Sequence, residues 1–443
     1  MLSKPKNNNQ LGFYSTFEEQ LDHSNGLFIL ANQINWKIFD DAFSKHYSLT
    51  QGAPAKSIRL MVSLLILKQL RNLSDESVVE QWAENSYFQY FSGEGYFCSS
   101  KPCVPTELVE FRKRIGEEGV ELILKESIRI NGKDGEDDNL SGDTTIQEKN
   151  ITFPTDDKLY KKIINKCHKI SEKENVQLRQ SYTSVLKKLS FVQRMKRNKG
   201  GQAKARKASK KVKTIAGRLT RELERKLTSE ALQKWGNDLQ LFKRVLSQRK
   251  SDSNKIYSLH EPSVKCYSKG KEHKKYEFGS KVSIMVTQKT GVIVGALNFS
   301  ESLHDTKTLE AALDQHKRLT GITAKNIYLD RGYPGRKQIG KTCLHIPKPD
   351  KKITATKKKR HRRRAAIEPV IGHLKRDYRM LRNFLKGNFG DAVNVMMAAA
   401  AMNFKRMMNK WKENPSFFTN FLLLLCNQII FFIYPNLTLK SIN

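Results

Sequence analysis

Cysteines are few in this sequence, and none forms a Cys-x-x-Cys pair. The chain has six of them in 443 residues. Cys98 with Cys103, or Cys167 with His168, gives only a weak signal for a zinc site. The first residues also lack the pattern of a secretory signal. These absences favour reduced thiols in a cytoplasmic protein over a secreted, disulfide-bonded one.

Acidic residues are scarce as well. The chain has 44 Asp and Glu against 80 Lys and Arg, which gives a formal charge of +36. The segment 194–213 contains no acid at all. A basic face without a partner is the weaker interpretation, because such an excess makes the chain repel itself. We therefore expect a polyanionic partner, with nucleic acid ahead of the ribosome or an anionic membrane, and we expect 194–213 to contact phosphates.

Long apolar runs are absent except at 417–433, which is close to membrane-spanning length. Asn420, Asn427 and Gln428 would then lie at hydrocarbon depth, which is costly. We expect a buried C-terminal helix or an apolar tail covered by a partner, and no membrane partner.

The order of the expected elements predicts an α/β fold. Residues 36–121 have helical periodicity, and 131–138 has the composition of a loop. Alternating apolar residues bounded by turn residues predict strands, and apolar residues that recur every three or four positions predict helices. The expected order is a strand at 141–151, basic helices at 158–248, strands at 276–287 and 292–299, a helix near 304, strands at 326–330 and 344–346, and a helix over 368–385. This order predicts a mixed sheet surrounded by helices.

Three acids lie beside polar or basic residues that would otherwise suit phosphate. They are Asp143 in Ser-Gly-Asp-Thr-Thr, Asp330 at the end of a short apolar strand, and Glu368 near a run of arginines. A carboxylate next to nucleic acid is electrostatically unfavourable unless a metal ion intervenes. The three acids therefore predict a Mg²⁺ site that acts on a phosphodiester. Each could instead cap a helix, form a turn or pair with a cation, and the competing ligands are Asp156, Asp157, Asp305 and Asp350.

The helix expected at Glu368 also places two cations near this acid. Lys375 follows Glu368 by about two helical turns, and Arg364 precedes it by one. Both could hold a phosphate. However, Pro369 fits best in a first helical turn, and in that case Arg364 lies outside the helix.

Several motifs together resemble those of bacterial insertion-sequence transposases of the DDE type. The resemblance covers roughly residues 40–405 in the same order. Its motifs are Asp143-Thr-Thr-Ile-Gln-Glu-Lys, Ile256-Tyr-Ser-Leu-His-Glu-Pro, Lys275-Tyr-Glu-Phe-Gly-Ser-Lys-Val, His304-Asp-Thr-Lys-Thr-Leu, Asp330-Arg-Gly-Tyr and Arg362-Arg-Arg-Ala-Ala-Ile-Glu-Pro-Val-Ile-Gly-His-Leu-Lys.

The resemblance implies a ribonuclease-H-like mixed sheet with flanking helices. It implies a helical N-terminal accessory or DNA-binding domain at 1–138 and a catalytic domain at 139–390. A large basic helical insertion, about 158–255, would follow the first strand, and 391–443 would hold a C-terminal helix and the apolar tail. We find no clear helix-turn-helix recognition helix in the N-terminal domain.

The resemblance also implies residue roles. Asp143, Asp330 and Glu368 match the metal-binding triad, which would hold two Mg²⁺ ions, with Mn²⁺ as a substitute. The family signature around the glutamate maps onto Arg364 and Lys375, and His361 stands at its tyrosine position. These three residues and Arg331 are the expected DNA contacts.

The implied reaction is hydrolysis at the ends of a mobile element, followed by attack of the freed 3′-hydroxyl on target DNA. The expected partners are double-stranded DNA, both terminal inverted repeats and target, and a second copy of the chain in a dimer on DNA. The protein would then be cytoplasmic and associated with the nucleoid. The alternative is a catalytically inactive DNA-binding relic of a transposase. An RNA-binding protein is disfavoured because its aromatic-rich sheet signature is absent.

Overall fold

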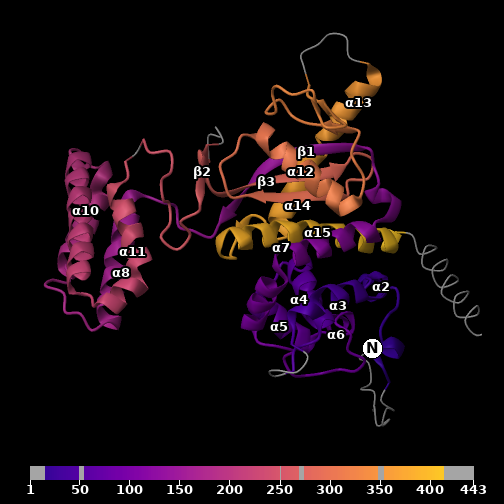
Figure 1. Ribbon diagram of the computed structural model, residues 1–443, viewed down its shortest axis with the longest axis horizontal. Coiled ribbons are helices and arrows are strands. Elements are labelled where there is room, and N and C mark those ends of the chain that lie inside the picture. Colours follow the sequence, from indigo (N-terminus) through magenta and orange to yellow (C-terminus); the bar gives the residue numbers. More distant parts are fainter. Residues whose placement is uncertain (1–14, 49–53, 250, 269–273, 348–353, 414–443) are drawn as a thin grey trace, which may run out of the picture.

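The computed structural model describes residues 15–48, 54–249, 251–268, 274–347 and 354–413 (Figure 1). The apolar run at 417–433 and Asp350 lie outside these residues. Within them, no helix is both long and apolar enough to cross a bilayer. The five cysteines that this part of the chain includes are all free thiols.

Helices make up the N-terminal part, as the periodicity predicts, and they pack beneath the sheet in Figure 1. Ile58–Leu70 is buried on nearly every side, which explains why its sequence is apolar all round. Ser57 caps this helix by accepting a hydrogen bond from the amide of Leu60. The main helices here are α1 (Phe17–Gln20), α2 (Gly26–Gln33), α3 (Lys37–Phe43), α4 (Ile58–Leu70), α5 (Asp75–Glu84), α6 (Ser86–Phe91) and α7 (Pro105–Ile130).

Three of these helices are joined by a buried ionic contact around Asp75, the first residue of α5. Lys68 on α4 and Arg112 on α7 both donate to its carboxylate, at 2.7–2.8 Å. Burial by itself would raise the pKa of Asp75, but the hydrogen bonds from Arg112 and the charge of Lys68 outweigh it and lower the pKa to about 2. This contact therefore stabilises the fold only while Asp75 is ionised.

A pH dependence of unfolding follows from this shift. The pKa of Asp75 lies below its ordinary value of 3.8, so its contribution is present above pH 4 and is lost as the pH falls toward 2. We expect Asp75→Asn to lower the free energy of unfolding by about 2 kcal/mol at pH 7. The difference between variant and wild type should shrink on acidification. Urea denaturation at several pH values measures it, and a pH-independent difference would contradict the assignment.

The sheet is mixed, which confirms the α/β prediction. Its strands follow the order β2-β3-β1-β5-β7-β6, with β4 also paired to β3 and β8 to β1. β1 is antiparallel to β3 and parallel to β5 and β8. The strands are β1 (Asn139–Lys149), β2 (Lys265–Ser268), β3 (Tyr276–Thr287), β4 (Ile293–Phe299), β5 (Asn326–Tyr328), β6 (Gln338–Ile339), β7 (Thr342–His345) and β8 (Arg382–Asn383).

The helix α15 (Gly387–Glu413) lies between the sheet and the N-terminal helices (Figure 1). It contacts β4 on one side and α2, α4 and α7 on the other. Ala398, Ala399, Ala400 and Ala401 are completely buried, and their small side chains let the neighbouring elements approach closely. One continuous cluster of buried residues therefore extends from the N-terminal helices into the sheet.

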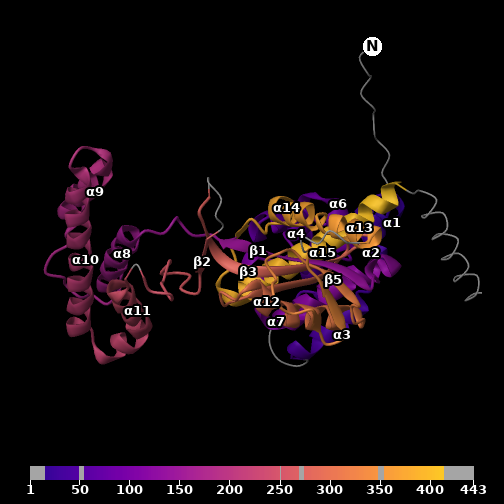
Figure 2. The same cartoon turned by 90° about the horizontal axis from the view of Figure 1, so that it is seen from above.

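Four helices lie in sequence between β1 and β2 and extend to one side of the sheet (Figures 1 and 2). They have their own buried cluster, which includes Ile163, Leu219 and Phe242. The acid-free segment 194–213 begins at the end of the second of these helices and covers the first half of the third, where it has exposed cations such as Lys207 and Lys211. The helices are α8 (Asp156–Lys173), α9 (Thr183–Arg194), α10 (Gly201–Lys226) and α11 (Ser229–Ser247).

The prediction of one helix over 368–385 is wrong. The helix α14 spans Ile367–Asp377 only. Arg379 then adopts a left-handed backbone conformation with φ of 63°, which ends the helical path. Beyond it, Arg382 and Asn383 pair with the end of β1 as strand β8. Leu381, which falls within the expected helix, is 54% exposed.

Candidate active site

Two of the predicted acids are aligned by strand register. β1 and β5 are parallel neighbours, and Ser141 pairs with Tyr328. Asp143 and Asp330 each follow that pair by two residues along their own chain segments. Paired residues in neighbouring parallel strands point to the same face of the sheet. The register therefore carries both carboxylates toward the same place, although Asp330 itself lies just beyond β5.

Buried Tyr333 marks the point where the acids meet. Its side chain is 1% exposed. Burial raises the pKa of this phenol strongly, and the negative charges of Asp143, Asp305 and Asp330 raise it further. The three carboxylates are therefore near enough to this phenol to interact with it electrostatically. The raised pKa keeps the phenol protonated at neutral pH.

The loop after β5 is shaped around two of these acids. The amide of Gly332 donates to Oδ1 of Asp330 at 2.8 Å. A Cβ atom at Gly332 would lie 3.0 Å from that oxygen and 3.4 Å from Oδ2 of Asp305. Asp330 and Asp305 therefore flank the same glycine, and a side chain at this position would crowd both of them.

Asp305 is held more tightly than a simple capping residue. It begins α12 (Asp305–Thr320), but His304 is the residue whose side chain caps this helix. The hydroxyl of Thr144 and the ammonium of Lys281 each donate to Oδ1 of Asp305 at 2.8 Å. Its charge is therefore already balanced by a cation on β3, unlike a carboxylate kept available for a metal ion.

Glu368 approaches the aspartates from the other side, through Arg364. Arg364 ends α13 (Ala355–Arg364), and Glu368 is the second residue of α14. The guanidinium lies 3.7 Å from Oδ2 of Asp143 and 3.8 Å from Oε1 of Glu368. Arg364 is only 17% exposed, whereas Glu368 is 67% exposed. Arg364 therefore lies outside the helix that carries Glu368, as the position of Pro369 predicts. It nevertheless contacts both acids.

The contacts of Asp143, Asp330 and Glu368 indicate which of these acids could bind one metal ion together. Carboxylate oxygens are the ligands that Mg²⁺ prefers, and the strand register directs those of Asp143 and Asp330 to the same side of the sheet. Glu368 stays on the far side of the Arg364 guanidinium. Accordingly, no group of three Asp, Glu, His or Cys side chains in the described residues is close enough to hold one ion. Asp143 and Asp330 offer ligand atoms of the kind that such an ion prefers, and Glu368 could join them only after Arg364 moves aside.

The predicted DNA contacts lie at different distances from the acids. His361 packs edge-on against Tyr328, with ring centroids 5.4 Å apart, so it lies over the β5 strand. Arg331 is exposed beside Asp330, and Lys375 is partly buried two turns along α14 from Glu368. Of the four, Arg364 forms ion pairs with two members of the predicted triad, Asp143 and Glu368.

Sequence reasoning missed three residues that build the site. Thr144 and Lys281 hold Asp305, and Tyr333 lies among the aspartates. A signal was present for two of them. Tyr333 belongs to the Asp-Arg-Gly-Tyr motif, and Lys281 interrupts the apolar residues of a strand that is buried along most of its length.

Comparison with known proteins gives two family matches. Residues 15–114 match the family described as "Transposase domain (DUF772)", and residues 246–404 match the family described as "Transposase DDE domain". The second match contains Asp330 and Glu368 and begins after Asp143. A Rhizobium meliloti protein, "Uncharacterized protein ORF8 in nfe locus", is 37% identical over 191 residues, which are 42% of this chain and 92% of the relative. No solved structure matches.

Proposed function

The chain belongs to the DDE-type transposases of insertion sequences, and we propose that it cleaves the ends of its element and joins them to target DNA. The observation that carries this proposal is the shared register of Asp143 and Asp330 on neighbouring parallel strands. In a strongly basic chain, two aligned carboxylates at a sheet position suit phosphodiester chemistry. The reaction would be hydrolysis at each end, followed by attack of the 3′-hydroxyl on the target.

Asp143, Asp330 and Glu368 would hold divalent metal ions, Mg²⁺ or Mn²⁺, in this proposal. Such ions, when bound, activate the attacking oxygen and stabilise the leaving oxygen of an in-line displacement. Arg364 would exchange its carboxylate partners for the phosphate as DNA enters. Lys281 and Thr144 would keep Asp305 in place, and buried Tyr333 would exclude water from the back of the site.

The proposed architecture follows from this assignment. Residues 139–390 would form a ribonuclease-H-like catalytic domain, interrupted by the basic helices, and 1–138 an accessory domain that binds element ends. The substrate would be duplex DNA with terminal inverted repeats, held by a homodimer near the nucleoid. His361, Arg331 and Lys375 would contact the DNA around the cleaved phosphate.

A strand-cleavage assay tests the proposal on the inverted repeats that flank the reading frame. We expect wild type with Mg²⁺ to nick these ends, and Asp330→Asn to lower the rate by at least about a thousandfold. Asp305→Asn is the matched control. It makes the same change of a carboxylate to an amide near Tyr333, but at an acid whose charge Lys281 already neutralises. Its loss should be far smaller.

Two outcomes would contradict the proposal. Equal cleavage by wild type and Asp330→Asn would remove Asp330 from the reaction. A wild-type chain that binds these ends in Mg²⁺ or Mn²⁺ and never nicks them would instead support the DNA-binding relic.

A further inference from the structure

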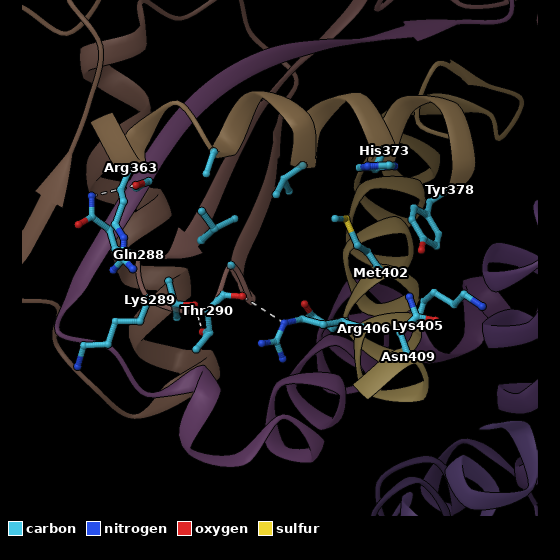
Figure 3. Close-up of a pocket in the computed structure, with 17 residues that line it drawn as sticks. Gln288, Lys289, Thr290, Arg363, His373, Tyr378, Met402, Lys405, Arg406 and Asn409 are labelled. Atoms are coloured by element: carbon cyan, nitrogen blue, oxygen red, sulfur yellow. Dashed lines mark hydrogen bonds between the residues drawn. The ribbon is translucent and has the colours of Figure 1, made fainter. Parts of the chain in front are cut away.

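A cavity beside the acids has no role in the site described so far. It has a volume of about 550 Å³ and lies between the turn that joins β3 to β4, the helix α14 and the helix α15 (Figure 3). We propose that this cavity binds one unpaired nucleotide of the DNA strand that enters the active site. The proposal rests on the proposed function, since it assigns a binding site for part of the same substrate.

The cavity adjoins the acids along β1 and along the helices. Ser141 lines it, and Asp143 lies two residues further along the strand, about 7 Å away. Arg363 lines it as well, while the next residue, Arg364, forms ion pairs with Asp143 and Glu368. A distance of about 7 Å is close to the length of one nucleotide in an extended strand. A strand with its phosphate at the acids therefore places its neighbouring nucleotide at the cavity.

Charge gives the first indication of the ligand. The lining residues include no Asp or Glu but several cations. Arg406 is occupied by Asn131, Asp134 and the carbonyl of Thr290, so it serves the fold. In contrast, the described part of the chain offers no carboxylate within ion-pair distance of Lys289, Arg363 or Lys405. The three side chains come from different elements, and those of Arg363 and Lys405 suit an anion, whereas Figure 3 shows the side chain of Lys289 directed away from the cavity.

Lys405 is the most informative of the three. It is partly buried on α15, and burial lowers its pKa, as do the nearby charges of Arg71 and Lys412. A cation in such surroundings destabilises the fold unless a negative group joins it. Figure 3 shows Lys405 on the wall formed by α15, next to Arg406 and Asn409. A phosphate in the cavity would supply the missing negative charge.

The apolar part of the lining explains why the ligand is a nucleotide and not a free phosphate. Val286, Val370, Tyr378 and Met402 line the cavity with apolar surface. A base can pack against such residues while its phosphate contacts Lys405, which is how single strands are commonly bound. The volume lies within the range for small-ligand pockets, so it admits one nucleotide and excludes a duplex.

The test measures binding without divalent metal, so that no cleavage occurs. The probes are a fluorescent duplex with a blunt end and the same duplex with a short 3′ single-stranded extension. We expect wild type to bind the extended probe more tightly. Lys405→Gln should weaken binding of the extended probe by about tenfold and of the blunt probe much less. Met402→Trp, which fills the cavity without a charge change, should remove the advantage of the extension.

Controls separate the cavity from general charge and from folding. Lys317→Gln removes the same charge at an exposed position outside the cavity and should affect both probes equally. Lys405→Gln should keep or raise the melting temperature, because it removes a cation from a positive environment. Equal binding of both probes by wild type, or an equal loss for both probes in Lys405→Gln, would refute the proposal. Neither result depends on whether the chain cleaves DNA, so the proposed function is judged separately.

Discussion

Replacing Asp143 with asparagine is expected to abolish strand cleavage while leaving DNA binding intact. The substitution keeps the shape of the side chain and the strand β1, but it removes the charge that would hold a metal ion. It also removes one of the two carboxylates that contact Arg364. We expect the cleavage rate to fall by at least about a thousandfold. Affinity for duplex DNA should stay the same or rise, because a negative charge leaves a site that contacts phosphates.

The same strand provides the control for this experiment. Asp138 immediately precedes β1 and pairs with Lys325 on the surface. Asp138→Asn therefore removes an identical charge five residues away without touching the acids, and it should cleave at the wild-type rate. Cleavage and filter binding, measured on the same preparations, give the two readouts. If Asp143→Asn cleaves as fast as Asp138→Asn, Asp143 is not a metal ligand.

The strands around the site could be predicted closely from sequence. Alternating apolar residues end at Lys289-Thr290-Gly291, and the structure places β3 at Tyr276–Thr287 and β4 at Ile293–Phe299. Local patterns suffice here because the turn and the alternation lie in one segment. The end of α14 depends on distant partners instead. Arg379 leaves the helical conformation, and Arg382 pairs with Glu148 at the end of β1, which no local pattern encodes.

The site, like the fold, has features that local sequence predicts and features that depend on distant partners. Residue type and context predicted Asp143, Asp330 and Glu368 as metal ligands, because a carboxylate beside nucleic acid is unfavourable without a metal ion, and this assignment stays a prediction. Their mutual arrangement depends on the pairing of β1 with β5, across more than 180 residues of sequence. Asp305 could be named only as a competing ligand, because its contacts with Lys281 and Thr144 come from strands that lie elsewhere in the sequence. Such contacts follow from sheet topology, which the sequence predicted only as a class.

A second large effect is expected from a lysine buried at the end of β1. Lys149 is 3% exposed and donates to Asp391 at 2.7 Å and to the carbonyls of Leu385 and Gly387 at 2.8 and 2.9 Å. Glu261, also buried, lies 3.6 Å away. The ammonium therefore neutralises two buried acids and fixes the start of α15 to the sheet. A buried charge of this kind is costly to leave without its partner.

We expect Lys149→Met to lower the free energy of unfolding by about 3–5 kcal/mol at pH 7. Burial already raises the pKa of Asp391, with Lys149 opposing that rise, so the variant should raise it further. A raised pKa in the folded state stabilises the fold at low pH and ceases to do so as the pH increases through that value. The deficit of the variant should therefore shrink on mild acidification, around the raised pKa of Asp391, whereas the deficit of Asp75→Asn shrinks only below pH 4. Urea denaturation across pH measures both.

A double substitution separates the loss of charge balance from the loss of packing. Lys149→Met combined with Asp391→Asn leaves one buried acid fewer without a cation, so it should recover part of the lost stability and lose most of the pH dependence. Lys325→Met, at a lysine 73% exposed in its surface pair with Asp138, should change stability by less than about 0.5 kcal/mol. If the double variant is less stable than Lys149→Met at every pH, Lys149 acts through its carbonyl contacts and packing. In that case charge balance would not be what anchors α15 to the strand that holds Asp143.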